Sequence, residues 1–266
     1  MSQPRASWMR ATAGVAWLTV QSLPRGRRGW AALLLLGFGP ALAGVAALVS
    51  AQTAPEDIFR NVAFYFTDWI ALWLLAAVFG LSLTSGEIEE GTAGYVLLGA
   101  LPKWAVLSVQ LAVTAAALGV LLGASLILTA LAAGGIPDFW RSIASCTLVA
   151  VAGLLVALPY AATCGLAFRS PGTALAAVSL PVIFGEFLVT HWPIRLAAYT
   201  VTNNLRALLL DLVFEGHRGP LYRYVKNFRL PDYRDAALFL ASMAGIFLAA
   251  AMIAAMNRPI EGREAR

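Results

Sequence analysis

Six long stretches of apolar residues constrain the fold of this chain more than any other feature. A helix needs roughly 20 mostly apolar residues to cross about 30 Å of hydrocarbon. Backbone groups in lipid must be paired within their own segment, so each stretch is expected to be a helix, and the alternating pattern of a membrane barrel is absent. The sequence predicts an all-α integral membrane protein with spans at 30–50, 62–83, 105–133, 143–168, 173–189 and 236–256.

The composition agrees with this prediction. Of the 266 residues, 60% are hydrophobic and only 12% are charged, whereas a soluble domain carries about a quarter charged residues. Most of the surface is therefore expected to face lipid. We divide the chain into an N-terminal segment (1–29), a membrane domain (30–256) and a C-terminal tail (257–266).

The first span has an alternative interpretation as a secretory signal, because Val49, Ser50 and Ala51 resemble a small-residue cleavage site. Its leader of 29 residues is long, and its apolar run exceeds that of a usual signal. We therefore expect the span to be retained.

The two cysteines, Cys146 and Cys164, both lie in the fourth predicted span. Eighteen residues of helix separate them by about 27 Å, so they cannot bridge each other within that helix. We expect both to be small packing residues.

Charge predicts the orientation in the membrane. The first 29 residues contain no acid and hold Arg5, Arg10, Arg25, Arg27 and Arg28, which places the N-terminus in the cytoplasm. Six spans return the C-terminus to the same side of the cell inner (plasma) membrane. The turn at 86–92 and the turn at 169–172 are then cytoplasmic as well.

The connection 190–235 disagrees with this orientation, because it holds seven Lys or Arg residues and would lie outside. If 173–189 were a re-entrant hairpin, this connection would be cytoplasmic instead. We favour the outside placement, because a strongly basic N-terminus usually dominates the orientation.

Two segments have the pattern of helices that lie along the membrane surface. From Trp8 to Leu23, apolar residues recur at helical spacing beside arginines, although a frayed basic tail is the alternative. From Ile194 to Phe214, apolar residues recur opposite the polar residues Arg195, Thr202 and Arg206.

The segment His217 to Arg229 alternates basic and aromatic residues. Such a pattern can bind single-stranded nucleic acid. Beside a membrane we interpret it as contact with lipid headgroups, and we expect no nucleic-acid partner.

Four residues within the spans predict how the helices pack and bend. Gly119 and Gly123 share one face and permit close approach of another helix. Pro159 and Pro181 each remove a helical hydrogen bond and are expected to bend their helices.

Asp68 and Glu186 are the acids placed well within predicted spans. A carboxylate near the bilayer centre costs roughly 3 kcal/mol, which calls for a functional hypothesis. We expect them to line a substrate path or to pair with Arg195 or another basic residue. The alternative is an interfacial position that reaches water.

The stretch Gly86 to Thr92 (GEIEEGT) places three carboxylates within four residues and must therefore leave the bilayer. The following twelve residues, Ala93 to Trp104, are too apolar for a solvated loop and too short to cross. An acidic turn joined to a half-apolar helix at the membrane face suits docking onto a soluble partner.

This region resembles the type-2 permease family of ATP-binding-cassette (ABC) transporters. Those subunits have a cytoplasmic amphipathic helix, six spans and an acidic Gly-Glu-x-Glu-x-Gly-Thr turn after the second span. The matching residues are Gly86, Glu87, Glu89, Gly91, Thr92, Leu97, Leu98, Pro102 and Lys103. Two departures affect the fine docking geometry: Lys103 follows the proline directly, and Gln110 stands where the family often has lysine.

The resemblance implies that Glu87 to Trp104 forms a coupling helix seated in a separate ATPase subunit. This chain contains no Gly-x-x-x-x-Gly-Lys-Ser/Thr phosphate loop, so ATP and Mg are expected on the partner and no enzymatic activity on the chain itself. The resemblance further implies a second permease copy or paralogue, and export as the direction. The apolar interior mildly favours a lipid-like cargo.

Two other functions stay open at this point. Adjacent Glu89 and Glu90 resemble the acids of membrane-embedded CAAX-type proteases, but Gly94 stands where those enzymes have arginine, and His191 and His217 lie outside or at the edge of the spans. The other is a non-transporting assembly or sensor subunit with the permease fold.

Overall fold

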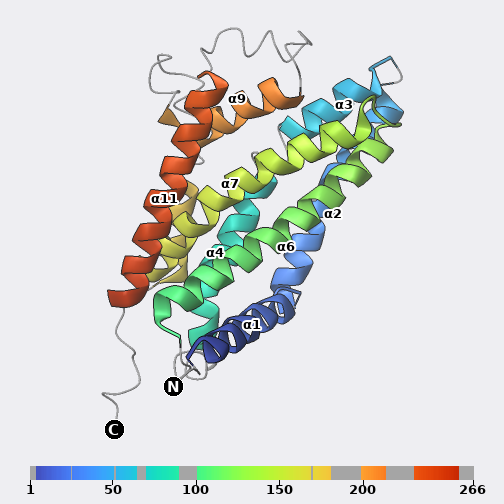
Figure 1. The fold of residues 1–266 in the computed structure, drawn as a ribbon. Helices are drawn as coiled ribbons and strands as arrows, with labels where there is room; N and C mark the ends of the chain where they lie inside the picture. Colours follow the sequence, from blue (N-terminus) through green and yellow to red (C-terminus); the bar gives the residue numbers. More distant parts are fainter. Residues whose placement is uncertain are drawn as a thin grey trace.

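The structure is a computed structural model that describes residues 4–24, 26–50, 52–64, 70–89, 101–168, 170–180, 199–213 and 231–257. Within these ranges the chain is helical and contains no strand (Figure 1). The labelled helices are α1 (Pro4–Ser22), α2 (Gly26–Val49), α3 (Pro55–Val62), α4 (Leu72–Glu89), α6 (Lys103–Ala132), α7 (Phe139–Ala167), α9 (Val201–Val213) and α11 (Tyr233–Asn257).

Four described helices are long and apolar enough to cross a membrane. They lie within a few residues of the first, third, fourth and sixth predicted spans, which confirms these segments as membrane-type helices. The apolar parts are Arg28–Val49, Lys103–Ala132, Phe139–Ala167 and Tyr233–Asn257. The chain therefore has the architecture of an all-helical, multi-pass membrane protein.

The second and fifth predicted spans are not confirmed. The second, 62–83, begins at the end of α3, and the apolar part of α4 extends only from Leu72 to Leu83. The fifth is described only over the short helix Pro171–Leu180, and its remainder lies outside the described residues. Part of each stretch is helical, but neither described helix is long enough to cross alone.

The first residues of the predicted acidic turn belong to a helix. α4 continues to Glu89, so that Gly86 to Glu89 form its last turn. The helix therefore extends more than one turn beyond its apolar part, which ends at Leu83.

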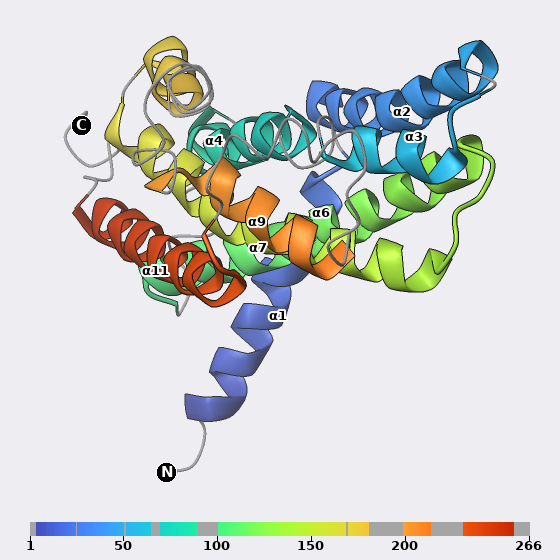
Figure 2. The same cartoon turned by 90° about the horizontal axis from the view of Figure 1, so that it is seen from above.

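The helices define two ends of the molecule (Figure 1). The near end holds α1, the C-terminal ends of α4 and α11 and the N-terminal end of α6. The far end holds α3, α9 and the N-terminal ends of α7 and α11. Seen from above, α1 extends outward from the other helices, and α9 lies over α7 beside α11 (Figure 2).

α7 is the central helix and packs against α4, α6, α9 and α11. In its most apolar stretch 56% of the residues are buried, compared with 17% in α11. A lipid-facing helix buries little inside its own chain, so α7 forms the interior and α11 the periphery.

Glycines let neighbouring helices approach α7 closely. A Cβ atom at Gly119 would lie 2.8 Å from Val151 Cγ2, and one at Gly123 would lie 3.3 Å from Thr147 Oγ1. At Gly80 of α4 it would lie 3.1 Å from the carbonyl oxygen of Leu158. The predicted close approach at Gly119 and Gly123 is confirmed, and its partner is α7.

Pro40 leaves a backbone acceptor within α2 that a neighbouring helix satisfies. A proline has no N–H, so the carbonyl oxygen of Leu36, four residues earlier, loses its helical donor. Ser125 of α6 donates its Oγ hydrogen to this oxygen over 2.6 Å in a buried position. The hydrogen bond thus satisfies the acceptor where no water can reach it.

α7 passes through Pro159 without ending, from Phe139 to Ala167. Thr163 Oγ1 donates to the Pro159 carbonyl over 2.7 Å and lies 3.4 Å from the Phe247 carbonyl of α11. The bend expected at Pro159 stays a prediction, and Pro181 lies outside the described residues.

Both cysteines are buried, and neither forms a disulfide bond with the other, as expected. Cys146 contributes to the main core, and Cys164 packs with Ala77, Ala161 and Val178 in a smaller cluster.

The Ser125–Leu36 hydrogen bond yields a stability prediction. Ser125→Ala should lower the free energy of unfolding in detergent by about 0.5–2 kcal/mol, because it leaves the Leu36 carbonyl without a donor. Adding Pro40→Ala should recover most of this loss, since residue 40 then supplies its own N–H. The matched control is Ser108→Ala, whose hydroxyl bonds within its own helix to the Trp104 carbonyl. An equal loss in the single and double variants would contradict this role for Ser125.

Candidate functional site

The predicted docking surface for a soluble partner lies between α4 and α6. Its first residues, Gly86, Glu87 and Glu89, form the last turn of α4. Its last residues, Pro102 and Lys103, are the N-cap and first residue of α6. The other predicted members, Gly91, Thr92, Leu97 and Leu98, lie outside the described residues.

The described ends of this surface meet at the near end of the molecule. α4 finishes there and α6 starts there, beside α1, which packs along α6 (Figure 1). Leu101 is buried, and Pro102 has an extended backbone before the helix begins. The backbone N–H of Ala105 donates to the Pro102 carbonyl over 2.9 Å, which closes the first turn of α6.

Lys103 occupies an unfavourable place for a positive charge. The N-terminus of a helix carries a partial positive charge that favours acids, and the first turn of α6 contains none. A basic residue at this position opposes the helix dipole.

α1 is a helix at the near end, as predicted, but its apolar strip is divided between two faces. Ala11 and Val15 are half-buried, whereas Trp8, Trp17 and Leu18 are exposed. The small residues thus lie on the more covered side of the helix. The exposed aromatic side chains are the kind that settle at a membrane interface.

The structure shows how the polar residues of α9 are placed. Thr202 is only 7% exposed, and its neighbours Asn203 and Asn204 are 2% and 1% exposed, whereas Arg206 is half-buried. α9 packs against α7 and α11 instead of lying on the surface. The apolar spacing correctly indicated a helix, but the spacing alone could not show that its polar face meets protein.

The guanidinium of Arg206 lies over the ring of Phe64, with the Cζ atom 5.1 Å from the ring centroid. This cation–π contact joins α9 to the segment that follows α3. Phe64, Asn203 and Asn204 were all missed by the sequence analysis. The run Thr-Asn-Asn inside an apolar helix was the available signal, and Arg195 lies outside the described residues.

The helix Pro171–Leu180 packs back along the C-terminal half of α7. Tyr160 donates its hydroxyl hydrogen to the Ala177 carbonyl over 2.8 Å, and Val178 is buried against Ala161 and Cys164. The segment that joins this helix to α9 lies outside the described residues, so the side of the connection 190–235 stays a prediction.

The interior contains an aromatic cluster that joins three helices. Trp73 of α4 meets Tyr160 of α7 edge-on, with ring centroids 6.4 Å apart. Tyr160 also contacts Phe247 of α11 at 4.9 Å. The Trp73 Nε1 is buried and has no hydrogen-bond partner among the described residues.

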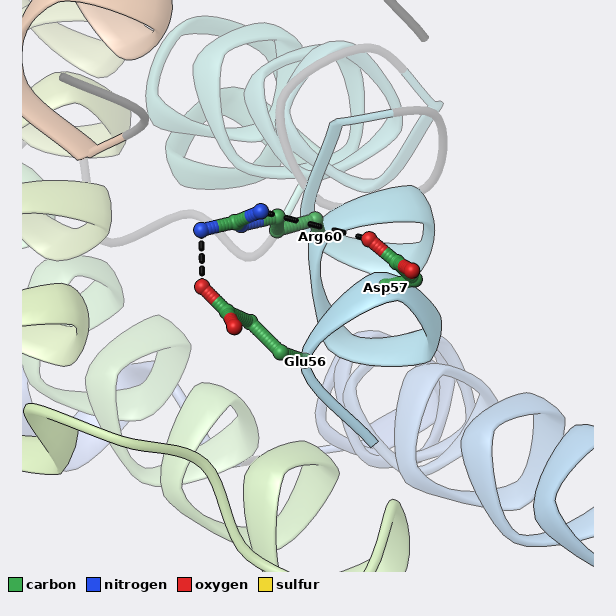
Figure 3. Close-up of polar contacts among 3 residues, drawn as sticks. All are labelled: Glu56, Asp57 and Arg60. Carbon is green, nitrogen blue, oxygen red and sulfur yellow. Dashed lines mark hydrogen bonds and ion pairs between the residues drawn. The ribbon is translucent and has the colours of Figure 1, made fainter. Parts of the chain in front are cut away.

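α3 is a short amphipathic helix at the far end that the sequence analysis did not predict; only its last residue, Val62, lies in a predicted span. Ile58 and Phe59 are buried, while Glu56 and Asp57 begin the helix after Pro55, where acids favour the dipole. Figure 3 shows Arg60 bonded to Glu56, with Asp57 3.9 Å away. The Arg60 side chain is only 15% exposed. The three charged residues thus lie beside the buried apolar residues of the same helix.

The predicted path acids, Asp68 and Glu186, both lie outside the described residues. In the described part of the chain, every fully buried polar side chain is neutral. No group of three His, Cys, Asp or Glu residues within that part could hold a metal ion.

No protein-family model matches the chain, and no curated protein matches it significantly.

A substitution of Lys103 tests its effect on helix stability and its contact with a partner separately. Lys103→Gln should leave the free energy of unfolding unchanged or raise it by less than about 1 kcal/mol, because it removes a charge that opposes the helix dipole. If Lys103 contacts a soluble partner, the same variant should bind that partner more weakly and with less salt dependence.

Arg141, which lies in the first turn of α7 at the opposite end, provides the matched control. Arg141→Gln should have a similar effect on unfolding and none on the partner. Thermal unfolding in detergent and a pull-down titration of the co-expressed partner measure the two effects. Equal partner binding by both variants and the unchanged chain would contradict a docking role for Lys103.

Proposed function

We propose that this chain is the transmembrane permease subunit of an ATP-driven, type-2 exporter-like ABC transporter. The observation that carries the proposal is the acidic end of α4 opposite the Pro102–Lys103 start of α6, at the same end as the basic N-terminus. The residues at both described ends match the motif that such permeases use to contact their ATPase subunit.

The proposed orientation follows from charge and from the arrangement of the helices. The basic N-terminal segment assigns the near end to the cytoplasm of the inner (plasma) membrane. The C-terminal end of α11 lies at the same end (Figure 1), and both termini are then cytoplasmic. The docking surface thus faces the compartment that supplies ATP.

α6 provides a direct mechanical connection between the two ends. Its 30 residues form one uninterrupted helix, which is about 45 Å long. Gly119 and Gly123 hold it tightly against α7, and Gly80 holds α4 against α7. Because close-packed helices move as rigid bodies, a displacement at Lys103 reaches the far end with little loss.

The chemistry of ATP belongs to the partner in this proposal. ATP and Mg bind to a separate ATPase subunit, whose closure moves the coupling segment and switches the path between inward-open and outward-open states. Glu87 and Glu89 supply acceptors for basic groups on that subunit. A second permease copy or paralogue completes the path, and lipid surrounds the pair.

The coupling acids provide the test. A variant with both Glu87→Ala and Glu89→Ala should insert normally in the membrane but lose substrate-stimulated ATP hydrolysis by the partner, because the force-bearing contact is weakened. Transport in reconstituted vesicles and ATPase rates with and without substrate are the measurements.

The control carries the same change of charge at the far end. Glu56→Ala with Asp57→Ala removes two acids of α3 and should leave the coupling ratio of transport to ATP hydrolysis unchanged. Normal coupling in the Glu87 and Glu89 variant would count against the permease assignment.

A further inference from the structure

We propose that a polar turn of α9 binds the anionic, oxygen-rich headgroup of an amphiphile. This turn, called the α9 polar site, is formed by the buried Thr202 and Asn203 and the half-buried Arg206. The proposal rests on the proposed function, because it assigns a substrate class to the same permease. It is carried by a separate observation at the far end of the molecule.

The Asn203 side chain has a hydrogen-bond donor with no acceptor. It is 2% exposed, and its Nδ2 atom has no hydrogen-bond partner among the described residues. Leaving a buried donor unsatisfied costs roughly 1–3 kcal/mol. A buried donor kept at such a cost is available to a bound molecule.

The positive charge of Arg206 predicts that the ligand is an anion. Arg206 supplies a positive charge from the same helix, and its guanidinium is held over the Phe64 ring. A guanidinium and an amide N–H both donate hydrogen bonds, and phosphate or carboxylate oxygens accept them. No carboxylate is fully buried in the described part of the chain, so nothing described there would hold a cation.

The remaining contacts of α9 suit an apolar tail. Leu205, Leu208 and Leu209 are buried on the same helix, and Leu205 lies with Leu72 of α4 against Gly153 of α7. The polar site is therefore continuous with the apolar core. A ligand with a charged oxygen-rich head and a hydrocarbon chain matches both environments.

Asn203 is covered in this structure, so a headgroup reaches it only when α9 moves relative to α7 and α11. The contact of Arg206 with Phe64 is one of the contacts that such a motion changes. Binding at this site would thus coincide with an opening of the far end.

The test uses the purified full chain in a non-ionic detergent and needs no ATPase. Three probes are titrated: oleoyl glycerol phosphate, monooleoylglycerol with the same tail, and inorganic phosphate. The phosphate-bearing amphiphile should bind about tenfold or more tightly than monooleoylglycerol, and inorganic phosphate should not displace it at similar concentration.

Asn203→Leu should weaken binding of oleoyl glycerol phosphate by about tenfold, because it removes a hydrogen bond to a charged group. The same variant should raise the unfolding temperature of the ligand-free chain, since it also removes the unsatisfied donor. Asp211→Asn, an exposed change on the same helix, is the matched control and should leave both quantities unchanged.

Several outcomes would overturn the proposal. Equal binding of monooleoylglycerol would show that only the tail is recognised. Displacement by inorganic phosphate at similar concentration would assign the site to a free anion. A lower unfolding temperature of Asn203→Leu with unchanged binding would make Asn203 structural. These measurements use the permease alone. A negative result here would overturn the α9 polar site, whereas a loss of the permease assignment would be seen in the ATPase coupling test.

Discussion

Close contact between α7 and its neighbours is the interaction on which the rest of this structure depends. In lipid, helices gain no hydrophobic free energy from meeting each other, so association relies on tight packing and on hydrogen bonds between helices. Gly119, Gly123 and Gly80 remove the side chains that would keep α6 and α4 away from α7. The helices therefore approach most closely where small residues face one another, while many large apolar side chains of α2, such as Leu34 and Leu48, face outward.

The same solvent explains the polar contacts. A backbone carbonyl freed by a proline cannot turn to water within the bilayer, and Ser125 satisfies the one freed by Pro40. Polar groups that lack such a partner carry a cost, which is why Asn203 is informative. In our proposal, packing connects the near end to the far end, and the unsatisfied donor of Asn203 is the point where a ligand binds.

Hydropathy and length predicted four helices to within a few residues, because the bilayer imposes one length on every span. The pair Gly119 and Gly123 was also predictable from its spacing. The second predicted span, 62–83, is not confirmed, because part of it lies outside the described residues and its described helix α4 is apolar only from Leu72 to Leu83. The short amphipathic helix α3 with its charges at Glu56, Asp57 and Arg60 lies just before this run and was not predicted. The burial of α9 was not predictable, because periodicity identifies a polar face and not the long-range contacts that cover it. The contact of Arg206 with Phe64 joins residues that are far apart in the sequence.

The most direct measurement places the docking surface on one side of the membrane. Both native cysteines are buried, so a single Glu87→Cys variant can be labelled selectively with a membrane-impermeant maleimide. Labelling is compared in inverted and right-side-out vesicles, with Glu56→Cys on α3 as the reference for the far end. The account predicts that position 87 reacts only in inverted vesicles, and less when the ATPase is bound, while position 56 reacts only in right-side-out vesicles. Labelling of position 87 from the exterior would contradict the account.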